Sequence, residues 1–419
     1  IAAGINLNIV TGVETVRVGL DDESVEVTFT GGNVSTLTTV TVDATAMTAG
    51  NPNTTTVTID AGQSDSDYNF VVLGGGASDV LVKLNAGVNN NIVFNAGGGD
   101  DEVRVQSGQD LGSTTFLSGG DGNDSIVLLG GFVNDDSFDS VSSFERLAAE
   151  GADLRAQLGA VAMASGLQEI EADAGDFDDN ILLDARFTGP LTVTVGGGVD
   201  VVNAGASVAA ITFNANGSEI TAADTLTGGK SAGDVVYLTA DDGVANFDGS
   251  SGIEQFIVVE SGDDDVGIVL TNASFVGVAS NTINVDASDL DDATTEASLT
   301  LVAGGVSGQL EVTGGSGNDT ITTGSGSDFI LAGRGADLIN AGEGDNDVNA
   351  GAGNDVITTG SGNDTINAGD GNDEVFAGNG DNVVNLGEGN DYVETGSGND
   401  IITNDGGNNT VRSGAGADD

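Results

Sequence analysis

From Gly314 to the end of the chain, apolar and polar positions recur with a period of nine residues. The eighth position is Ile or Val in all eleven units that reach it, commonly between polar residues, as in Thr320-Ile321-Thr322. Polar-apolar-polar alternation is typical of a short strand with one side chain facing inward. The other six positions are rich in glycine, which predicts a sharp turn. Each nine-residue unit therefore predicts one strand and one turn.

Two such units make one coil of two strands and two turns, so residues 18 apart should stack roughly 4.8 Å from each other. The region holds twelve units in unbroken phase, the last of which stops two residues short. Stacked coils of this kind form a parallel β-solenoid. We therefore predict an all-β chain, with irregular solenoid coils upstream and a regular β-roll over residues 314–419.

The turns have a consistent chemistry. The fourth position is Gly in all twelve units, and the sixth is Asp except at Asn346, Asn382 and Asn409. Glycine turns that converge backbone carbonyls beside a carboxylate offer the all-oxygen surroundings that calcium prefers. Stacking sorts the candidate ligands into two edges. Edge one contains Asp319, Asp337, Asp355, Asp373, Asp391 and Asn409, and edge two contains Asp328, Asn346, Asp364, Asn382, Asp400 and Asp418.

Six turns on each edge leave five gaps, so we expect about ten calcium ions, one between each stacked pair. An Asn keeps an oxygen but loses the charge, so the gaps beside Asn346 and Asn382 should bind more weakly. The expected core is only two columns of Ile and Val, too thin to fold by hydrophobic burial alone. Calcium binding should therefore supply much of the folding free energy of residues 314–419.

Looser versions of the turn occur upstream. Gly74–Asp79, Ala96–Asp101 and Gly119–Asp124 follow the template and make Asp79, Asp101 and Asp124 further candidate calcium ligands. Less regular turns precede Asp200 and Asp234. Their spacing is uneven, so the sequence does not predict a long ladder of sites in this part of the chain.

A second motif places an acid between apolar residues at the start of a strand, at Val13–Val16, Phe144–Leu147 and Ile253–Phe256. Its recurrence predicts solenoid modules over residues 1–140, 141–250 and 251–313, stacked with the β-roll of residues 314–419 in one continuous solenoid. The segment Ala152–Met163 is rich in good helix formers. Its alignment with Asp264–Leu270, which follows the motif at Ile253–Phe256, favours a pair of short strands slightly over a short helix.

Composition excludes several classes of function. The chain has 66 acidic and 9 basic residues, a net charge of −57, and repels itself unless counter-ions bind. This charge argues against nucleic acid as a partner. No apolar run approaches the ~18 residues that would span a membrane. The chain has no His and no Cys, which excludes Ser-His-Asp and Cys-His catalysis and thiolate metal sites. We therefore do not expect an enzyme.

The phased Gly-Gly-x-Gly-x-Asp array of residues 314–419 resembles the RTX (repeat-in-toxin) family, which implies a calcium-filled parallel β-roll. Together with the Thr/Val-rich upstream coils, it is similar to calcium-dependent surface-layer proteins, extracellular filaments and RTX adhesins of Gram-negative bacteria. That resemblance implies type I secretion, an extracellular or cell-surface location, and self-assembly, either head to tail or side by side. Besides a second copy of the chain, we expect a cell-surface polysaccharide, held through calcium bridges, as a partner. The alternative is a stalk, or the secretion and folding region of a longer adhesin or exoenzyme.

Overall fold

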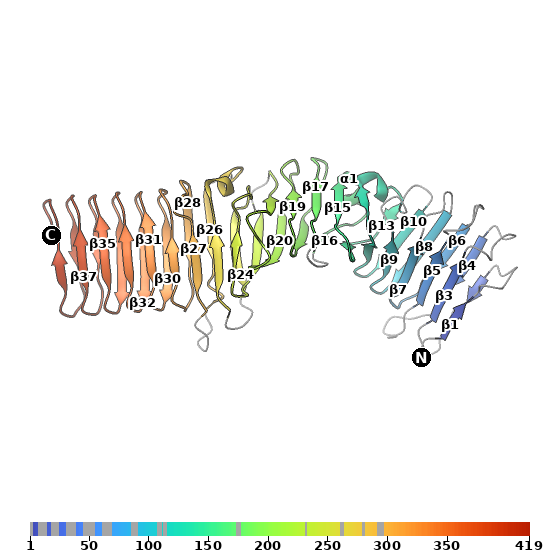
Figure 1. Ribbon diagram of the computed structural model, residues 1–419, viewed down its shortest axis with the longest axis horizontal. Coiled ribbons are helices and arrows are strands. Elements are labelled where there is room, and N and C mark those ends of the chain that lie inside the picture. Colours follow the sequence, from blue (N-terminus) through green and yellow to red (C-terminus); the bar gives the residue numbers. More distant parts are fainter. Residues whose placement is uncertain are drawn as a thin grey trace. The chain divides into compact units, whose positions relative to one another are not determined.

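The computed structural model describes residues 3–6, 15–17, 25–30, 39–44, 55–60, 69–84, 91–106, 111, 115–172, 177–230, 233–259, 264–278, 281–290 and 297–419. The chain divides into two compact units, Ile1–Ala209 and Ala210–Asp419. Each unit is a solenoid of parallel strands, coloured blue to green in the first unit and green to red in the second (Figure 1). The predicted fold class, an all-β parallel solenoid, is confirmed.

The first unit has three sheets. The first sheet contains β1 (Ala3–Asn6), β3 (Val25–Thr30), β5 (Thr55–Asp60), β7 (Asp79–Leu84), β9 (Glu102–Val105), β11 (Ser125–Leu128), β14 (Arg146–Ala149), β16 (Glu169–Ala172) and β18 (Leu191–Val195), each parallel to the next. The second contains β2 (Thr15–Arg17), β4 (Thr39–Asp43), β6 (Asn69–Leu73), β8 (Asn91–Gly98), β10 (Thr115–Asp121) and β13 (Val141–Ser142). The third contains β12 (Phe132–Asn134), β15 (Arg155–Leu158), β17 (Asn180–Leu183) and β19 (Val201–Asn203).

The second unit has two main sheets. One contains β20 (Ile211–Asn216), β22 (Val235–Thr239), β24 (Gln255–Val259), β26 (Thr282–Asp286), β28 (Gln309–Thr313), β30 (Phe329–Arg334), β32 (Asp347–Ala352), β34 (Thr365–Asp370), β36 (Val383–Asn385) and β38 (Ile401–Thr403). The other contains β23 (Gly243–Asn246), β25 (Val266–Val269), β27 (Leu299–Val302), β29 (Thr320–Thr322), β31 (Leu338–Gly342), β33 (Val356–Thr359), β35 (Glu374–Gly378), β37 (Tyr392–Thr395) and β39 (Thr410–Arg412). The strand β21 spans Thr225–Thr227, and the 3₁₀ helix η3 spans Asn272–Phe275.

From β28 onward the chain alternates between the two sheets, and each strand pairs with the strand one coil away. Phe329 pairs with Asp347 and Leu338 with Val356, a register of 18 residues. The prediction of an 18-residue coil is therefore confirmed. In the first unit the coils are longer and of uneven length. Backbone-to-side-chain hydrogen bonds there join turns that lie 22, 23 and 21 residues apart.

The core of the roll is wider than the sequence predicts. The Ile and Val side chains of position eight are buried as expected from Ile321 to Val393, whereas Val411 in the last coil is 50% exposed. The first position of the units is buried as well. Its members with an apolar side chain are Ala332, Ala341, Ala350, Ala368, Ala377 and Leu386, all at 0% exposure. Each of these residues lies two positions after the Ile or Val of position eight, so its side chain points to the same inner side of the strand.

The prediction for Ala152–Met163 is half wrong. Its first part forms the strand β15, but the next residues form the short helix α1 (Ala160–Ala164) instead of a second strand. The helix starts where Asp135 Oδ1 accepts hydrogen bonds from the backbone N–H groups of Gly159, Val161 and Ala162 at 2.9–3.0 Å. Asp135 belongs to the 3₁₀ helix η2 (Asp135–Phe138) of the preceding coil. A cap supplied from another coil is not visible in a local sequence pattern.

The division into four modules stays a prediction, since compactness places a boundary only between Ala209 and Ala210. Among the described residues, no helix has the length and apolar character needed to cross a membrane.

Adjacent residues of β31 test the inward-facing column. Ile339 is fully buried, whereas Leu338 is half exposed on the outer face. We expect Ile339→Ala to lower the free energy of unfolding by about 2–5 kcal/mol, because it removes buried methyl groups and leaves a cavity. The matched variant Leu338→Ala should change it by less than about 0.5 kcal/mol. Denaturant unfolding at saturating calcium measures both, and equal losses would contradict the observed orientation of the strand.

Candidate metal centre

The position-six side chains form two ladders along the roll. On edge one, Oδ1 of each residue accepts a hydrogen bond from the backbone N–H of its counterpart one coil earlier. The donor–acceptor pairs are Asp319–Asp337, Asp337–Asp355, Asp355–Asp373, Asp373–Asp391 and Asp391–Asn409, at 2.8–3.1 Å. Edge two repeats this for Asp328–Asn346, Asn346–Asp364, Asp364–Asn382, Asn382–Asp400 and Asp400–Asp418, at 2.9–3.2 Å. The two predicted edges therefore exist as two continuous rows.

The second carboxylate oxygen in these ladders is buried without a hydrogen-bond donor. The aspartates concerned are 0–2% exposed, and their Oδ2 atoms have no partner in the protein: Asp328, Asp337, Asp355, Asp364, Asp373, Asp391 and Asp400. A buried charged oxygen without a partner is strongly destabilising. Asp319 differs, because its Oδ2 accepts from the Gly315 N–H at 3.1 Å. The other aspartates of these ladders require either a proton or a cation beside Oδ2.

The turn glycines bring backbone carbonyls next to these carboxylates. A Cβ atom placed on Gly371 would lie 1.4 Å from the carbonyl oxygen of Gly353 one coil earlier, and Gly371 has φ +152°. The position-two residue Gly369 meets the carbonyl oxygen of Gly351 in the same way, at 1.9 Å. No side chain fits in that space, which explains why position four is Gly in all twelve units.

Burial raises the pKa of several of these carboxyls. The pKa of Asp337 rises to about 7, first because burial removes water and then because the charges of Asp319 and Asp355 repel its own. Burial also raises the pKa of Asp319 and Asp373 to about 6. These carboxylates are poorly stabilised by the protein alone, as expected for groups that bind a cation.

The donor set fits calcium. All candidate side-chain ligands are carboxylate or amide oxygens, and calcium takes six to eight oxygens in flexible geometry. Within the described ranges no three acidic, His or Cys side chains gather as a metal cluster. Backbone carbonyls of the glycine turns must therefore complete the coordination of an ion at Oδ2. Soft metals that need thiolate or imidazole do not fit these residues.

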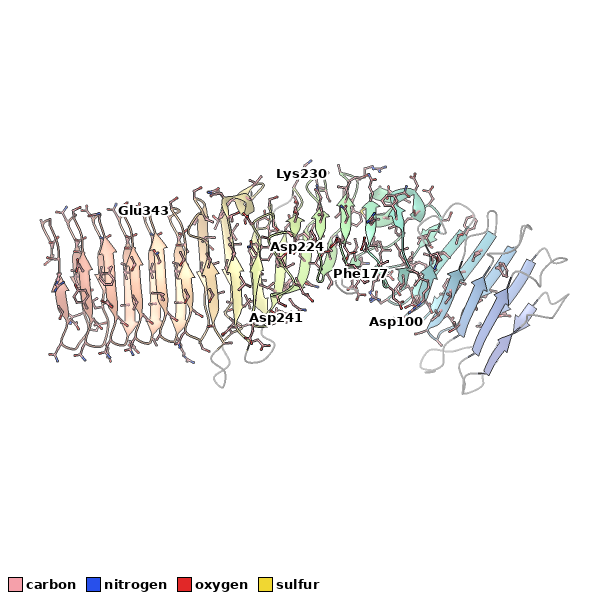
Figure 2. The ribbon with its side chains drawn as sticks, viewed as in Figure 1. Asp100, Phe177, Asp224, Lys230, Asp241 and Glu343 are labelled. Carbon is pink, nitrogen blue, oxygen red and sulfur yellow. The ribbon has the colours of Figure 1, made fainter. Side chains whose placement is uncertain are left out.

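The same ladder occurs in the first unit, where Asp79, Asp101 and Asp124 were predicted. The N–H of Asp79 donates to Asp101 Oδ1 at 2.6 Å, and the N–H of Asp101 donates to Asp124 Oδ1 at 2.8 Å. The Oδ2 atoms of Asp101 and Asp124 are buried without a partner. Burial raises the pKa of Asp101 to about 8 and that of Asp124 to about 6. The exposed Asp100, labelled in Figure 2, marks this edge of the unit.

The glutamates of the second sequence motif end these ladders, a role that the sequence did not suggest. Glu145 Oε2 accepts from the Asp124 N–H at 2.9 Å. In the second unit, Glu254 Oε2 accepts from the Gly233 and Asp234 N–H groups at 3.0 and 2.9 Å. The glycine-acid turns and the glutamate motif are therefore parts of the same hydrogen-bonded ladders. The first two residues of Val13–Val16 and the pair Ser231–Ala232 lie outside the described residues.

Two further rows of side chains that accept backbone hydrogen bonds were not predicted from the sequence. In the third sheet of the first unit, the Asp179 N–H donates to Asp200 Oδ1 at 2.9 Å. In the roll, position-five side chains form a ladder of opposite direction, in which Asn354 Oδ1 accepts from the Asn372 N–H at 2.8 Å and Asn372 Oδ1 from the Asn390 N–H at 2.9 Å. Position five is Asn in seven of the twelve units. That preference for Asn is the sequence signal from which this ladder could have been predicted.

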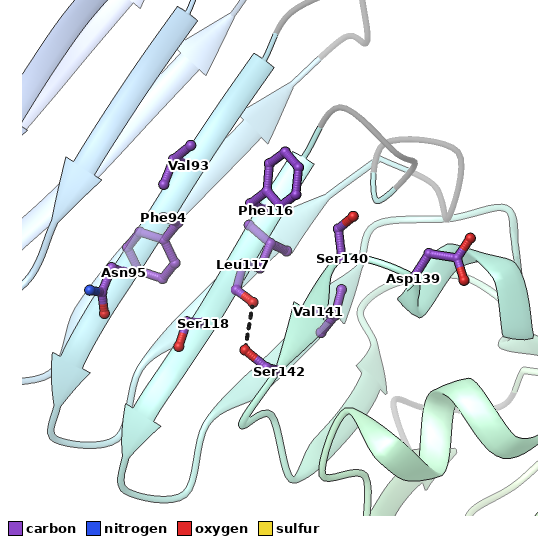
Figure 3. Close-up of a pocket in the computed structure, with 10 residues that line it drawn as sticks. All are labelled: Val93, Phe94, Asn95, Phe116, Leu117, Ser118, Asp139, Ser140, Val141 and Ser142. Carbon is purple, nitrogen blue, oxygen red and sulfur yellow. Dashed lines mark hydrogen bonds between the residues drawn. The ribbon is translucent and has the colours of Figure 1, made fainter.

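The first unit also has an open cavity of about 460 Å³ on the outer face of β8, β10 and β13 (Figure 3). Val93 and Phe116 lie exposed in it, and Ser142 Oγ donates to the Leu117 carbonyl at 3.4 Å. Asp139 is the one carboxylate among its lining residues. The lining therefore offers no pair of carboxylates for acid–base chemistry of the glycosidase kind.

Comparison with known families identifies the repeats. A model of the RTX calcium-binding nonapeptide repeat, four copies long, matches residues 115–132, 313–348, 340–375, 349–384, 367–402 and 385–419. No curated protein and no solved structure matches the chain significantly. RTX nonapeptide repeats bind calcium and are typical of secreted proteins. The chain therefore carries RTX calcium-binding nonapeptide repeats, in residues 115–132 and 313–419.

Proposed function

We propose that this chain is a non-enzymatic extracellular structural protein that folds around calcium and assembles with copies of itself into a surface layer or filament. The observation that carries the calcium part is the double row of buried carboxylates whose Oδ2 atoms lack a donor. We assign the calcium ions to the gaps between stacked position-six residues of both edges, and to Asp79, Asp101 and Asp124 in the first unit.

Each residue has a defined task in this proposal. Oδ1 is held by the N–H of the neighbouring coil, which orients the carboxylate, and Oδ2 faces the glycine turn. Calcium bound there neutralises the stacked charges and joins two coils at the same time. Because the roll buries only narrow columns of small and branched side chains, its folding depends on that neutralisation.

Self-assembly is supported by the outer face of the second unit. Val383 of β36 and Ile401 of β38 are neighbours in register and are 43% and 47% exposed. An apolar strip on the flat face of a parallel sheet can be covered by a second copy side by side. The net charge of −57 opposes such contact, and bound calcium lowers that repulsion.

A calcium bridge to a cell-surface polysaccharide is part of the same proposal, and it is supported by the exposed carboxylates of Asp345 and Asp381 beside the turns. The second candidate function is a stalk or secretion module of a longer adhesin or exoenzyme. The calcium-binding repeats support both candidates equally, and only the exposed apolar strip favours assembly.

Position six on the two edges provides a matched pair of variants. Asp355→Ala and Asn382→Ala each remove one buried ladder acceptor, but only the first removes a charged Oδ2. We expect residues 314–419 of the full chain to exchange amide hydrogens rapidly without calcium and to become protected at ~0.1–1 mM calcium. Asp355→Ala should raise the calcium midpoint by about tenfold or more, and Asn382→Ala much less. Equal midpoints in hydrogen-exchange mass spectrometry would contradict the ligand assignment.

The raised pKa values predict how acid affects the calcium-free protein. Asp337 with a pKa of about 7, and Asp319 and Asp373 with pKa values of about 6, bind more protons in the folded than in the unfolded chain. The stability of the calcium-free roll should therefore fall as the pH rises from about 4 to 7. Lowering the pH from 8 to 5 should raise its strand content and also raise the calcium midpoint. Circular dichroism that is independent of pH in calcium-free buffer would oppose this.

Sedimentation and light scattering test the assembly itself. We expect the chain to be monomeric in chelator and to form large particles at saturating calcium. The double variant Val383→Ser and Ile401→Ser should bind calcium normally but assemble less, while Thr365→Ser on the same face serves as the control. A monomer at saturating calcium would instead support the stalk function.

A further inference from the structure

The two edges of the roll differ in a way that a nine-residue repeat does not require. On edge one, position six stays Asp in five successive coils, from Asp319 to Asp391. On edge two, position six alternates between Asp and Asn in the first five coils, and position one alternates with it. The pairs in chain order are Thr323 with Asp328, Ala341 with Asn346, Thr359 with Asp364, Ala377 with Asn382 and Thr395 with Asp400. Edge two therefore repeats every second coil.

The threonines of edge two bind the following coil without a charge. Thr323 Oγ1 donates to the Ala341 carbonyl at 2.9 Å, and Thr359 Oγ1 donates to the Ala377 carbonyl at 2.9 Å. Both side chains are 96% or more buried. Each bond crosses the gap that has Asp on one side and Asn on the other. On edge one, position one holds Gly, Ala or Leu in the first five coils, so no hydroxyl bond of this kind can form.

The asparagines present a donor where the aspartates present an acceptor. Oδ1 of Asn346 must face the Asp328 N–H, 3.0 Å away, because that N–H needs an acceptor. Nδ2 therefore faces the turn, where it donates to the Gly344 carbonyl at 3.1 Å. Asn382 is oriented in the same way by the Asp364 N–H, and its Nδ2 is buried. An N–H group at this place repels a cation. At Asn346 it also occupies a carbonyl of the turn.

The charge available to an ion differs accordingly. Four gaps of edge one lie between two aspartates, whereas four gaps of edge two lie between an Asp and an Asn. Calcium affinity depends strongly on the number of charged ligands. On the rim of edge two the Ser361 N–H donates to Glu343 Oε2 at 3.1 Å. Glu343 is labelled in Figure 2.

We propose that the two edges are distinct classes of calcium site. Edge one binds calcium tightly between paired carboxylates and depends on it. Edge two is held at Asn346 and Asn382 by amide and hydroxyl hydrogen bonds, and it takes calcium weakly, with neither Asn as a ligand. This inference rests on the proposed calcium binding and replaces the expectation that both asparagines coordinate an ion. The roll therefore loads in two steps as calcium rises.

Calcium binding to the full chain, measured by equilibrium dialysis with radioactive calcium, tests the proposal. We expect two classes of site whose midpoints differ by about tenfold or more. The variant Asn346→Asp with Asn382→Asp should move weak sites into the tight class. The mirror variant on edge one, Asp355→Asn with Asp373→Asn, should remove tight sites and leave the weak class unchanged. Thr359→Val should loosen edge two in hydrogen exchange without changing the number of tight sites.

The outcomes distinguish a failure of the two site classes from a failure of the proposed calcium binding. One class of sites in the unmodified chain, with an unchanged isotherm for Asn346→Asp and Asn382→Asp, would overturn the distinction between edges while leaving calcium binding intact. No calcium binding by the unmodified chain would instead overturn the proposed function. The single variant Asn346→Asp carries the same expectation, a gain of tight sites, where the double variant does not fold.

Discussion

Buried carboxylates stacked at the spacing of a parallel sheet are the constraint on which the roll depends. Asp337 lies between Asp319 and Asp355, with almost no exposure to water and with no donor at Oδ2. Neither hydrogen bonding nor burial within the protein offsets the repulsion in such a row. A divalent cation between two of these carboxylates would offset it, and it would need only the carbonyls that the turn already brings there.

The glycines and the carboxylates are parts of one geometric solution. The carbonyl of Gly353 occupies the space of a side chain on Gly371, so adjacent turns approach as closely as the strands do. Any Cβ at position four would push the turns apart and widen the gap beside the carboxylates. The regularity of position four therefore follows from the same close stacking that gives the gap its size. A flexible glycine-rich linker would have no need for that phase.

Most of the roll could be predicted because its period couples every level of structure. The nine-residue phase fixes the 18-residue coil, and the coil sorts Asp319 and Asp328 to opposite edges. Features that depend on contacts between coils were less accessible. The cap that Asp135 provides for α1 and the end of the Asp124 ladder at Glu145 join residues 21–27 positions apart without a fixed period. The sequence shows the preference for Asn at position five. The ladder itself could not be predicted, because its hydrogen bonds form only between stacked coils.

The direction of the position-six bonds suggests how order passes along the roll. The position-six N–H of one coil donates to the position-six carboxylate of the next coil, as from Asp355 to Asp373. A folded coil therefore orients the ligand of its C-terminal neighbour before that neighbour binds an ion. The opposite ladder at position five, from Asn372 back to Asn354, returns a bond to the earlier coil. Each coil is thus tied to its neighbours in both directions, so its stability is set by its nearest neighbours, as in a one-dimensional array. In such an array an Asn at position six keeps the ladder bond and gives up only the ion. The stack can therefore tolerate Asn346 and Asn382 on one edge while the other edge keeps its carboxylate pairs.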